Sequence, residues 1–239
     1  MSTTSSEPRR EELAANLAQV RDRIAAAERA AGRPAGEVSL VVVTKYFPAS
    51  DVRLLAGLGV RGVGENRHQE AQAKAAECAD LDLVWHFIGG LQSNKASAVA
   101  RYADVVESVD RARLVAPLAR GAAEAGRRVD VLLQVSLDAP DHVGERSGAA
   151  AAELHALAEQ VSAADSLRLR GLMAVAPLGE EPARAFERLA AIRERFVGDF
   201  PEAAVLSAGM SGDLEEAIAV GATHVRVGSA VLGSRPGVL

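Results

Sequence analysis

Eight short apolar segments alternate with helix-like segments along this chain of 239 residues. The apolar segments are rich in β-branched and aliphatic residues, which favours buried strands. They occupy residues 39–44, 60–65, 83–89, 104–109, 129–137, 167–175, 204–209 and 223–231. Segments with helical spacing of apolar residues lie between them, at residues 49–59, 66–79, 93–102, 111–125, about 149–164, 181–197 and 212–220. Nearly continuous apolar strands separated by helices are typical of a parallel sheet with both faces covered.

Eight such units predict an α/β fold of the (β/α)8 TIM-barrel type, and the chain length is close to the roughly 250 residues usual for that fold. An open doubly wound sheet is the alternative. It would more often carry a glycine-rich fingerprint after its first strand, where this chain has Lys45-Tyr46-Phe47-Pro48. The barrel is therefore the preferred prediction.

The N-terminal region adds a helix before the first strand. Apolar residues recur at helical spacing from Leu13 to Ile24, which predicts an extra amphipathic helix over residues 11–31. Residues 1–10 are polar and are expected to form a flexible tail. No linker or low-complexity segment follows, so residues 11–239 are expected to form a single barrel domain.

Composition excludes several classes of protein. The net charge is −5, which gives no reason to expect a nucleic-acid partner, and no window has the roughly 18 continuous apolar residues of a membrane helix. The first ten residues lack the apolar core of a secretory signal. Cys78 is the single cysteine, which excludes an internal disulfide and any metal site with several cysteines. We therefore expect a cytoplasmic protein with no membrane partner.

Lysine is scarce in this chain. Of 27 basic residues only Lys45, Lys74 and Lys95 are lysines. A general bias toward arginine accounts for most of this, but arginine cannot replace lysine where an amine must lose its proton and react. The three lysines therefore merit individual attention.

Polar residues stand at or near the ends of the expected strands, where a barrel carries its active site. They are Lys45, Glu65, Asn66, His86, Glu107, Gln134, Ser207 and Arg226, with Met173 at the sixth strand. Partial burial of Lys45 would lower the pKa of its amine, and the neutral amine can form a Schiff base with a carbonyl. Alternatively, Lys45 lies on the rim of the barrel and pairs with a carboxylate such as Glu65.

Two segments near the C-terminus have the features of an anion site. "LSAGMSGDLEEAI" places a small-residue loop with Ser211 between the seventh strand and its helix, where free backbone amides favour an anion. The alternative is an ordinary N-cap formed by Ser211 or Asp213. "VRVGSAVLGSR" adds Gly228 and Ser229 after the eighth strand, and the loops after strands seven and eight are the recurrent phosphate site of these barrels.

Arg226 lies inside an apolar strand and needs a partner, either a carboxylate or a ligand, because burying a lone charge is costly. An amine, a phosphate site and this arginine together suggest pyridoxal 5′-phosphate (PLP). Its aldehyde would join Lys45, its phosphate would lie on the last two loops, and its ring nitrogen would face Arg226. An always-charged arginine favours an unprotonated ring, which is a weaker electron sink.

The remaining candidates are weaker. We expect His86 to be a core histidine with its hydrogen bonds satisfied, Lys74 to lie on a solvated helix face, and Cys78 to be a small buried residue. Lys95 is expected on the exposed first turns of a helix, although "LQSNK" could reach an anion. The other histidines have no metal-ligand spacing: His68, His142, His155 and His224.

Several motifs, in order from about residue 39 to residue 235, resemble the YggS/PROSC family, the pyridoxal phosphate homeostasis proteins. They are "VVVTKYFPASDV", "GVGENRHQEAQAK", "WHFIGGLQSNKA", "LRGLMAV" and "LSAGMSGDLEEAIAVGATHVRVGSAVLG". The resemblance implies the fold-type III barrel of the alanine racemase N-terminal domain. It implies these roles: Lys45 as the Schiff-base lysine, Arg226 as the partner of the pyridine nitrogen, Asn66 near the cofactor, and Ser207, Met210, Ser211, Gly228 and Ser229 on the phosphate-binding segments.

The sequence departs from the family pattern at two places. Tyr46-Phe47 follows Lys45 where smaller or polar residues are common in the family, and Ala208 stands where methionine is common. Neither change removes a contact group, so they bear on the shape of the pocket rather than on binding.

The choice between a carrier and an enzyme depends on a second acid/base. Related racemases have a further β-rich domain that supplies a tyrosine, and this chain ends at the expected barrel. Tyr46 would point away from Lys45 if the strand continued, and Tyr102 lies at the wrong end. We therefore expect a monomeric, non-enzymatic protein that binds PLP and buffers or delivers it to PLP-dependent apoenzymes. The alternatives are a weak amino-acid racemase, an aldolase acting on a phosphorylated aldehyde, or a scaffold for other proteins.

Overall fold

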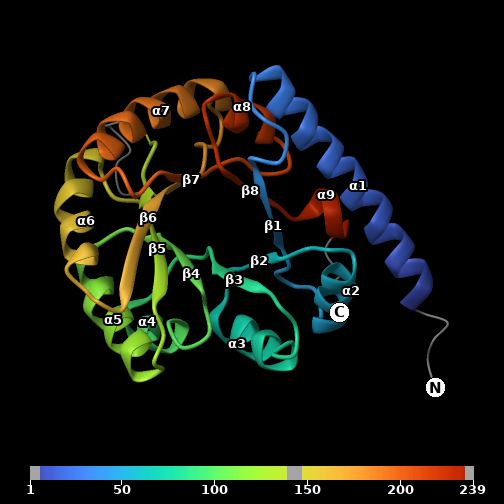
Figure 1. Cartoon of the computed structure of the whole chain (residues 1–239), viewed down its shortest axis with the longest axis horizontal. Coiled ribbons are helices and arrows are strands. Elements are labelled where there is room, and N and C mark those ends of the chain that lie inside the picture. The colour runs from blue at the N-terminus through green and yellow to red at the C-terminus, as the bar shows by residue number, and fades with distance from the viewer. Residues whose placement is uncertain (1–5, 139–146, 235–239) are drawn as a thin grey trace.

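The computed structural model describes residues 6–138 and 147–234, which form a closed barrel of eight parallel strands surrounded by helices (Figure 1). The strands are β1 (Ser39–Val43), β2 (Gly62–Glu65), β3 (Val84–Phe87), β4 (Val105–Val109), β5 (Val129–Val135), β6 (Leu167–Ala174), β7 (Val205–Ser207) and β8 (His224–Val227). The α-helices are α1 (Ser6–Ala30), α2 (Ala49–Gly57), α3 (His68–Glu77), α4 (Ser93–Val99), α5 (Val115–Glu124), α6 (Leu154–Ser162), α7 (Pro182–Asp199), α8 (Leu214–Ala219) and α9 (Ser229–Leu232). Short 3-10 turns precede α5 (η1, Ala112–Leu114) and α6 (η3, Ala151–Glu153). The predicted (β/α)8 barrel with an extra N-terminal helix is confirmed.

The barrel closes between its first and last strands. β1 pairs in parallel with β8, with Val41 opposite Arg226, and with β2, with Val41 opposite Gly62. All strands therefore end at the same mouth of the barrel, which we call the upper mouth, and begin at the opposite, lower mouth.

Two apolar clusters surround the strands. One joins α1, α2 and α9 to β1, β2 and β8, and it includes Leu13, Leu17 and Val20 of α1. Complete burial of such a side chain contributes about 1.5–3 kcal/mol, so α1 is held on the barrel by its apolar face. The other cluster lies under α4 to α7 and includes the fully buried Phe186.

The interior of the barrel is more polar than these outer layers. His86, Glu107, Ser207 and Arg226 are all buried there on four different strands. Buried polar and charged groups are costly unless they are paired, so these four residues must satisfy one another or a ligand.

Several boundaries differ from the sequence prediction by a few residues, and two of these differences assign residues to another type of structure. Helix α1 begins at Ser6, so residues 6–10, expected in the flexible tail, are helical; residues 1–5 lie outside the described residues. Arg9 accounts for this, because its guanidinium binds the carboxylate of Asp51 at 2.7 Å and the carbonyl oxygen of Leu232 at 3.0 Å. The last strand ends at Val227 rather than at residue 231, and helix α9 follows.

The short helix α9 could not be read from the sequence because it has only four residues and follows an apolar strand directly. Val231 and Leu232 are buried in the cluster formed with α1, and this tertiary contact overrides the strand propensity of Val231. Among the described residues no helix is long and apolar enough to cross a membrane.

Candidate functional site

A cavity of about 380 Å³ lies at the upper mouth, beside the ends of β1 and β8. We call it the upper cavity. The structure brings six of the eight residues predicted for cofactor binding to its wall: Lys45, Met210, Ser211, Arg226, Gly228 and Ser229. The sequence analysis did not assign the others: Val43, Tyr46, Phe47, Ile88, Gly212 and Gly233.

The backbone on both sides of Lys45 is held in place. Lys74 Nζ donates to the carbonyl oxygen of Thr44 at 2.7 Å, and the backbone N–H of Tyr46 donates to Glu70 Oε1 at 2.6 Å. Lys74 and Glu70 are themselves joined at 2.7 Å. The two peptide groups that flank Lys45 are therefore fixed by one ion pair, while the amine of Lys45 makes no hydrogen bond or ion pair to any described residue.

Lys74 is buried, so the prediction of a solvated lysine was wrong. Its ammonium group also binds Glu65 Oε1 at 2.7 Å, and Glu65 accepts a second hydrogen bond from the hydroxyl of Thr44. Burial raises the pKa of Glu65 although Lys74 and Thr44 act to lower it. Glu65, the alternative partner considered for Lys45, is thus engaged by Lys74.

Tyr46 lines the same cavity as Lys45, contrary to the expectation that it would point away. That expectation required the strand to continue, but β1 ends at Val43 and Tyr46 has a φ of +71°. A positive φ is uncommon for a residue with a side chain, and the bond from Tyr46 N–H to Glu70 helps to hold it. The Tyr46 ring lies 5.1 Å from the guanidinium of Arg67, a cation–π contact.

The loop before α8 is shaped by glycine and by Asp213. Gly209 has a φ of +89°, and a Cβ there would come within 2.7 Å of the Cβ of Ala217, so only glycine fits. The carboxylate of Asp213 accepts from the backbone N–H of Met210, and Asp213 makes no side-chain cap to α8. Asp213 therefore closes the loop instead of capping the helix, and Arg23 of α1 binds the carbonyl oxygen of Ser211 at 3.1 Å.

Four backbone amides in two loops remain available at the cavity. Those of Ser211, Gly212, Gly228 and Ser229 donate no hydrogen bond to the residues that the structure describes. The two serine hydroxyls approach each other to 3.4 Å. A Cβ on Gly228 would lie 3.2 Å from the carbonyl oxygen of Val43, so glycine keeps this loop close to β1. Amides grouped in this way form a concavity suited to an anion.

Arg226 satisfies its charge inside the barrel and still borders the cavity. Its Nη1 donates to Ser207 Oγ at 2.7 Å and lies 3.8 Å from Glu107 Oε2, and its Nη2 donates to the carbonyl oxygen of Ala174 at 2.8 Å. Its Nε donates to no described residue. The predicted partner is thus a carboxylate, and Nε is one of the donors left for a ligand.

Glu107 is the carboxylate at the centre of the barrel. It accepts from Ser207 Oγ at 2.6 Å and contacts His86 Nδ1 at 2.7 Å. Burial acts to raise its pKa, but His86, Arg226 and Ser207 outweigh that and lower the pKa to about 2. Ser207, predicted on a phosphate-binding segment, therefore has its hydroxyl engaged inside the barrel, and it is not part of the upper-cavity wall.

Three other polar residues considered from the sequence are not part of the upper-cavity wall either. Asn66 follows β2 and packs its backbone on Gly89, and its Oδ1 is buried with no hydrogen-bond partner in the described structure. His86 is buried and bonded to Glu107, and it borders a second cavity at the lower mouth. Lys95 is half-buried on α4. His142 lies outside the described residues.

Comparison with known proteins shows the class of protein to which this barrel belongs. The family model of the alanine racemase N-terminal domain matches residues 15–236. The pyridoxal phosphate homeostasis protein of Mycobacterium tuberculosis is 44% identical over 243 residues, which cover 95% of this chain and 94% of that protein. The protein of the same name from Escherichia coli is 40% identical over 230 residues, covering 94% of this chain and 97% of that protein.

A solved structure agrees with these relatives. PipY of Synechococcus elongatus, determined with PLP bound, superposes with a TM-score of 0.78 at 36% identity, covering 92% of this chain and 100% of PipY. This chain belongs to the family of pyridoxal phosphate homeostasis proteins, within the class of alanine racemase N-terminal domains. The family resemblance seen in the sequence is confirmed.

Proposed function

We propose that this protein binds pyridoxal 5′-phosphate in the upper cavity, attached to Lys45 as a Schiff base, and buffers or delivers it without strong catalysis of its own. The observation that carries the proposal is the position of Lys45. The amine of Lys45, which has no hydrogen bond or ion pair to the described residues, lies on a backbone fixed at both sides and shares one cavity with four amides and Arg226. The names of the relatives and the PLP-bound PipY structure support the same ligand.

The residues of the cavity match the functional groups of this cofactor. Lys45 would hold the aldehyde, and the amides of Ser211, Gly212, Gly228 and Ser229 would hold the phosphate. Arg226 Nε would donate to the ring nitrogen. When bound, the cofactor supplies a ring that withdraws electrons from an attached amine, and a permanently charged arginine cannot protonate that ring. This arrangement favours holding the cofactor over using it.

Binding is tested by adding PLP to the purified protein and removing the excess by gel filtration. We expect a saturable visible absorbance with one cofactor per chain. A colourless protein that retains no cofactor would contradict the proposal.

Delivery is tested with a PLP-dependent apoenzyme as the recipient. The loaded protein is mixed with the apoenzyme in the presence of a phosphatase that destroys free PLP. We expect enzyme activity to return faster than with the same amount of free cofactor, and equal rates would contradict delivery.

One observation favours a second candidate function, a weak Schiff-base enzyme such as an amino-acid racemase. Tyr46 lines the same cavity as Lys45, and its phenol would be a second acid/base. Exchange of the α-proton of alanine in deuterated water separates the two functions. A carrier exchanges it no faster than free PLP, whereas an enzyme exchanges it faster and loses the difference in Tyr46→Phe. The monomeric state and the cytoplasmic location remain predictions.

A further inference from the structure

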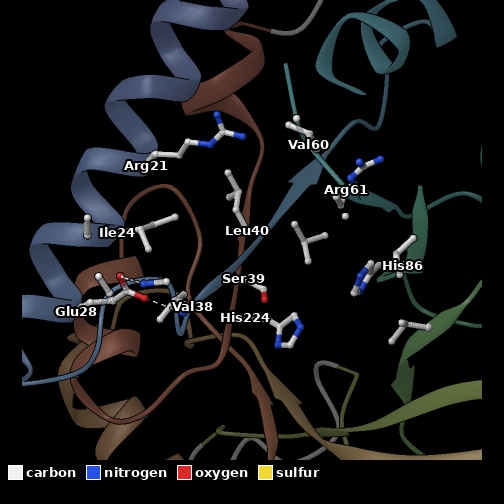
Figure 2. Close-up of a pocket in the computed structure, with 18 of the residues that line it drawn as sticks. Arg21, Ile24, Glu28, Val38, Ser39, Leu40, Val60, Arg61, His86 and His224 are labelled. Atoms are coloured by element: carbon white, nitrogen blue, oxygen red, sulfur yellow. Dashed lines mark hydrogen bonds between the residues drawn. The ribbon is translucent and has the colours of Figure 1, made fainter. Parts of the chain in front are cut away.

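A second and larger cavity, of about 610 Å³, lies at the lower mouth of the barrel (Figure 2). We call it the lower cavity. Its wall is formed by the first residues of six strands, by α1 and by the segment between α1 and β1. The volume lies within the roughly 300–1,000 Å³ typical of small-molecule sites. None of its lining residues is shared with the upper cavity.

Gly62 of β2 lines the lower cavity and puts no side chain into it. The interior of such a barrel is ordinarily filled by layers of branched side chains. A Cβ on Gly62 would lie 3.6 Å from His86 Nε2 and 3.3 Å from the carbonyl oxygen of Leu40. The glycine therefore leaves one ring nitrogen of His86 uncovered.

Imidazole rings supply the polar part of this cavity. His86 is only 7% exposed, and its Nδ1 contacts Glu107 while its Nε2 has no hydrogen-bond partner among the described residues. The ring of His224 lies 6.2 Å from it, centroid to centroid, and both rings are visible beside Ser39 in Figure 2. Burial, with smaller effects of nearby charges, lowers the pKa of His224 to about 4, so this ring is neutral at physiological pH.

Most charged groups around the lower cavity already have partners within the protein. Asp130 forms two hydrogen bonds with Arg168, at 2.7 and 2.9 Å, and Glu28 accepts from the backbone N–H groups of Gly36 and Val38. Arg61 pairs with Asp82 at 3.2 Å.

Arg21 differs from these groups. Its one hydrogen bond goes to the carbonyl oxygen of Leu58, and it has no ion pair with any described residue. Figure 2 shows its side chain extending from α1 toward Val60 across the cavity. An anionic group of a ligand at this position would give Arg21 a counter-ion.

We propose that the lower cavity binds a small organic acid with an apolar, ring-sized body. Its carboxylate would pair with Arg21, its body would lie against Ile24, Leu40 and Val60, and a hydroxyl or N–H group at the far end would donate to His86 Nε2. The cation selects for a carboxylate at one end of such a molecule, the imidazole selects for a donor at the other end, and the apolar wall selects for the body between them. The inference stands on this cavity alone and does not depend on PLP binding.

The probe is 4-hydroxybenzoate, which carries a carboxylate and a hydroxyl at opposite ends of one ring. Its binding to the full chain is measured by titration calorimetry, beside benzoate, which lacks the donor, and phenol, which lacks the charge. We expect 4-hydroxybenzoate to bind more tightly than either. No saturable binding, or equal binding of the three compounds, would overturn the proposal.

Variants locate the binding. Arg21→Gln removes the cation and should weaken binding about ten-fold or more, because a hydrogen bond to a charged group is lost. Gly62→Ala covers His86 Nε2 and should weaken it similarly. The matched controls are Arg10→Gln on the same helix and Gly198→Ala, whose Cβ would meet nothing within 4 Å, and both should bind as the parent does.

Two further measurements test whether the loss of binding is local to the lower cavity. All variants are checked for an unchanged melting temperature and unchanged PLP absorbance, and a Gly62 variant that fails this check leaves Arg21→Gln to decide. Loading with PLP should not displace the probe. Displacement by PLP, or unchanged affinity in both test variants, would place the probe elsewhere and overturn the proposal.

Discussion

The two mouths of this barrel present different chemistry although one set of strands builds both. The upper cavity has a lysine amine, a group of backbone amides and Arg226, and the lower cavity has two imidazoles, aliphatic walls and Arg21. The larger cavity is the one without the amine and the amide groups. Cavity size therefore does not select the cofactor site that we propose, whereas the chemistry of its donors supports it.

A row of buried side chains in contact with one another connects the two mouths. Glu107 contacts His86 of the lower cavity on one side and lies 3.8 Å from Arg226 of the upper cavity on the other, with Ser207 between the last two. The charge of Arg226 is therefore balanced by the carboxylate of Glu107 rather than by solvent. The comparison can be tested by perturbing each mouth separately.

The largest expected effect is at the upper mouth. Lys74→Met leaves the buried carboxylate of Glu65 without its cation, and removing one partner of a buried ion pair costs about 3–5 kcal/mol. We expect the free energy of unfolding in urea to fall by that amount. The control is Lys95→Met. Lys95 is half-buried and has no ion pair in the described structure, so this change should alter the free energy of unfolding by less than about 0.5 kcal/mol. Equal effects of the two changes would show that the Lys74 ion pairs are unimportant.

The lower mouth should respond to pH. The folded-state pKa of His224 is about 4, below the ordinary value of 6.5, so between these values the unfolded chain takes up a proton that the folded chain does not. Stability is therefore lost as the pH falls from 6.5 to 4, by on the order of 3 kcal/mol. His224→Gln should remove this dependence, measured as unfolding free energy against pH. A variant with the same pH profile as the parent would contradict the assignment.

Glu107 should respond at lower pH than His224. Its pKa is about 2 in the folded state against an ordinary 4.5, so its contribution is present above 4.5 and is lost as the pH falls toward 2. Comparison of Glu107→Gln with the parent should show a difference that shrinks across this range. A difference that stays constant from pH 4.5 to 2 would argue against an ionised Glu107.

The smallest expected effect concerns one hydroxyl of the upper mouth. Ser229→Ala should weaken PLP binding several-fold, because one hydrogen bond contributes about 0.5–1.5 kcal/mol. The spectroscopic titration with PLP measures this, and binding of 4-hydroxybenzoate should stay unchanged. Loss of probe binding in Ser229→Ala would show that the two mouths are not independent in this respect.

The fold could be predicted because its signals are local. Each strand and helix has its own apolar periodicity, and eight repeats leave few arrangements. The upper cavity could be predicted in part for the same reason, since the ends of parallel strands must meet. Lys45, Ser211 and Arg226 follow from their places beside β1, α8 and β8.

The remaining features depend on contacts between distant residues. Lys74 points inward because α3 is turned toward Glu65, and no spacing within that helix shows its rotation. Tyr46 enters the cavity because β1 ends at Val43 and the chain takes a positive φ. The sequence analysis placed Glu107 at a strand end. Its partners could not be predicted, because His86, Ser207 and Arg226 come from three other strands.

The central claim is that Lys45 holds the cofactor. The direct measurement is reduction of the PLP-loaded protein with borohydride, followed by peptide mass spectrometry. The account predicts one pyridoxyl phosphate group, on Lys45, and none in Lys45→Ala. A group on Lys74 or Lys95, or an unchanged adduct in Lys45→Ala, would contradict it.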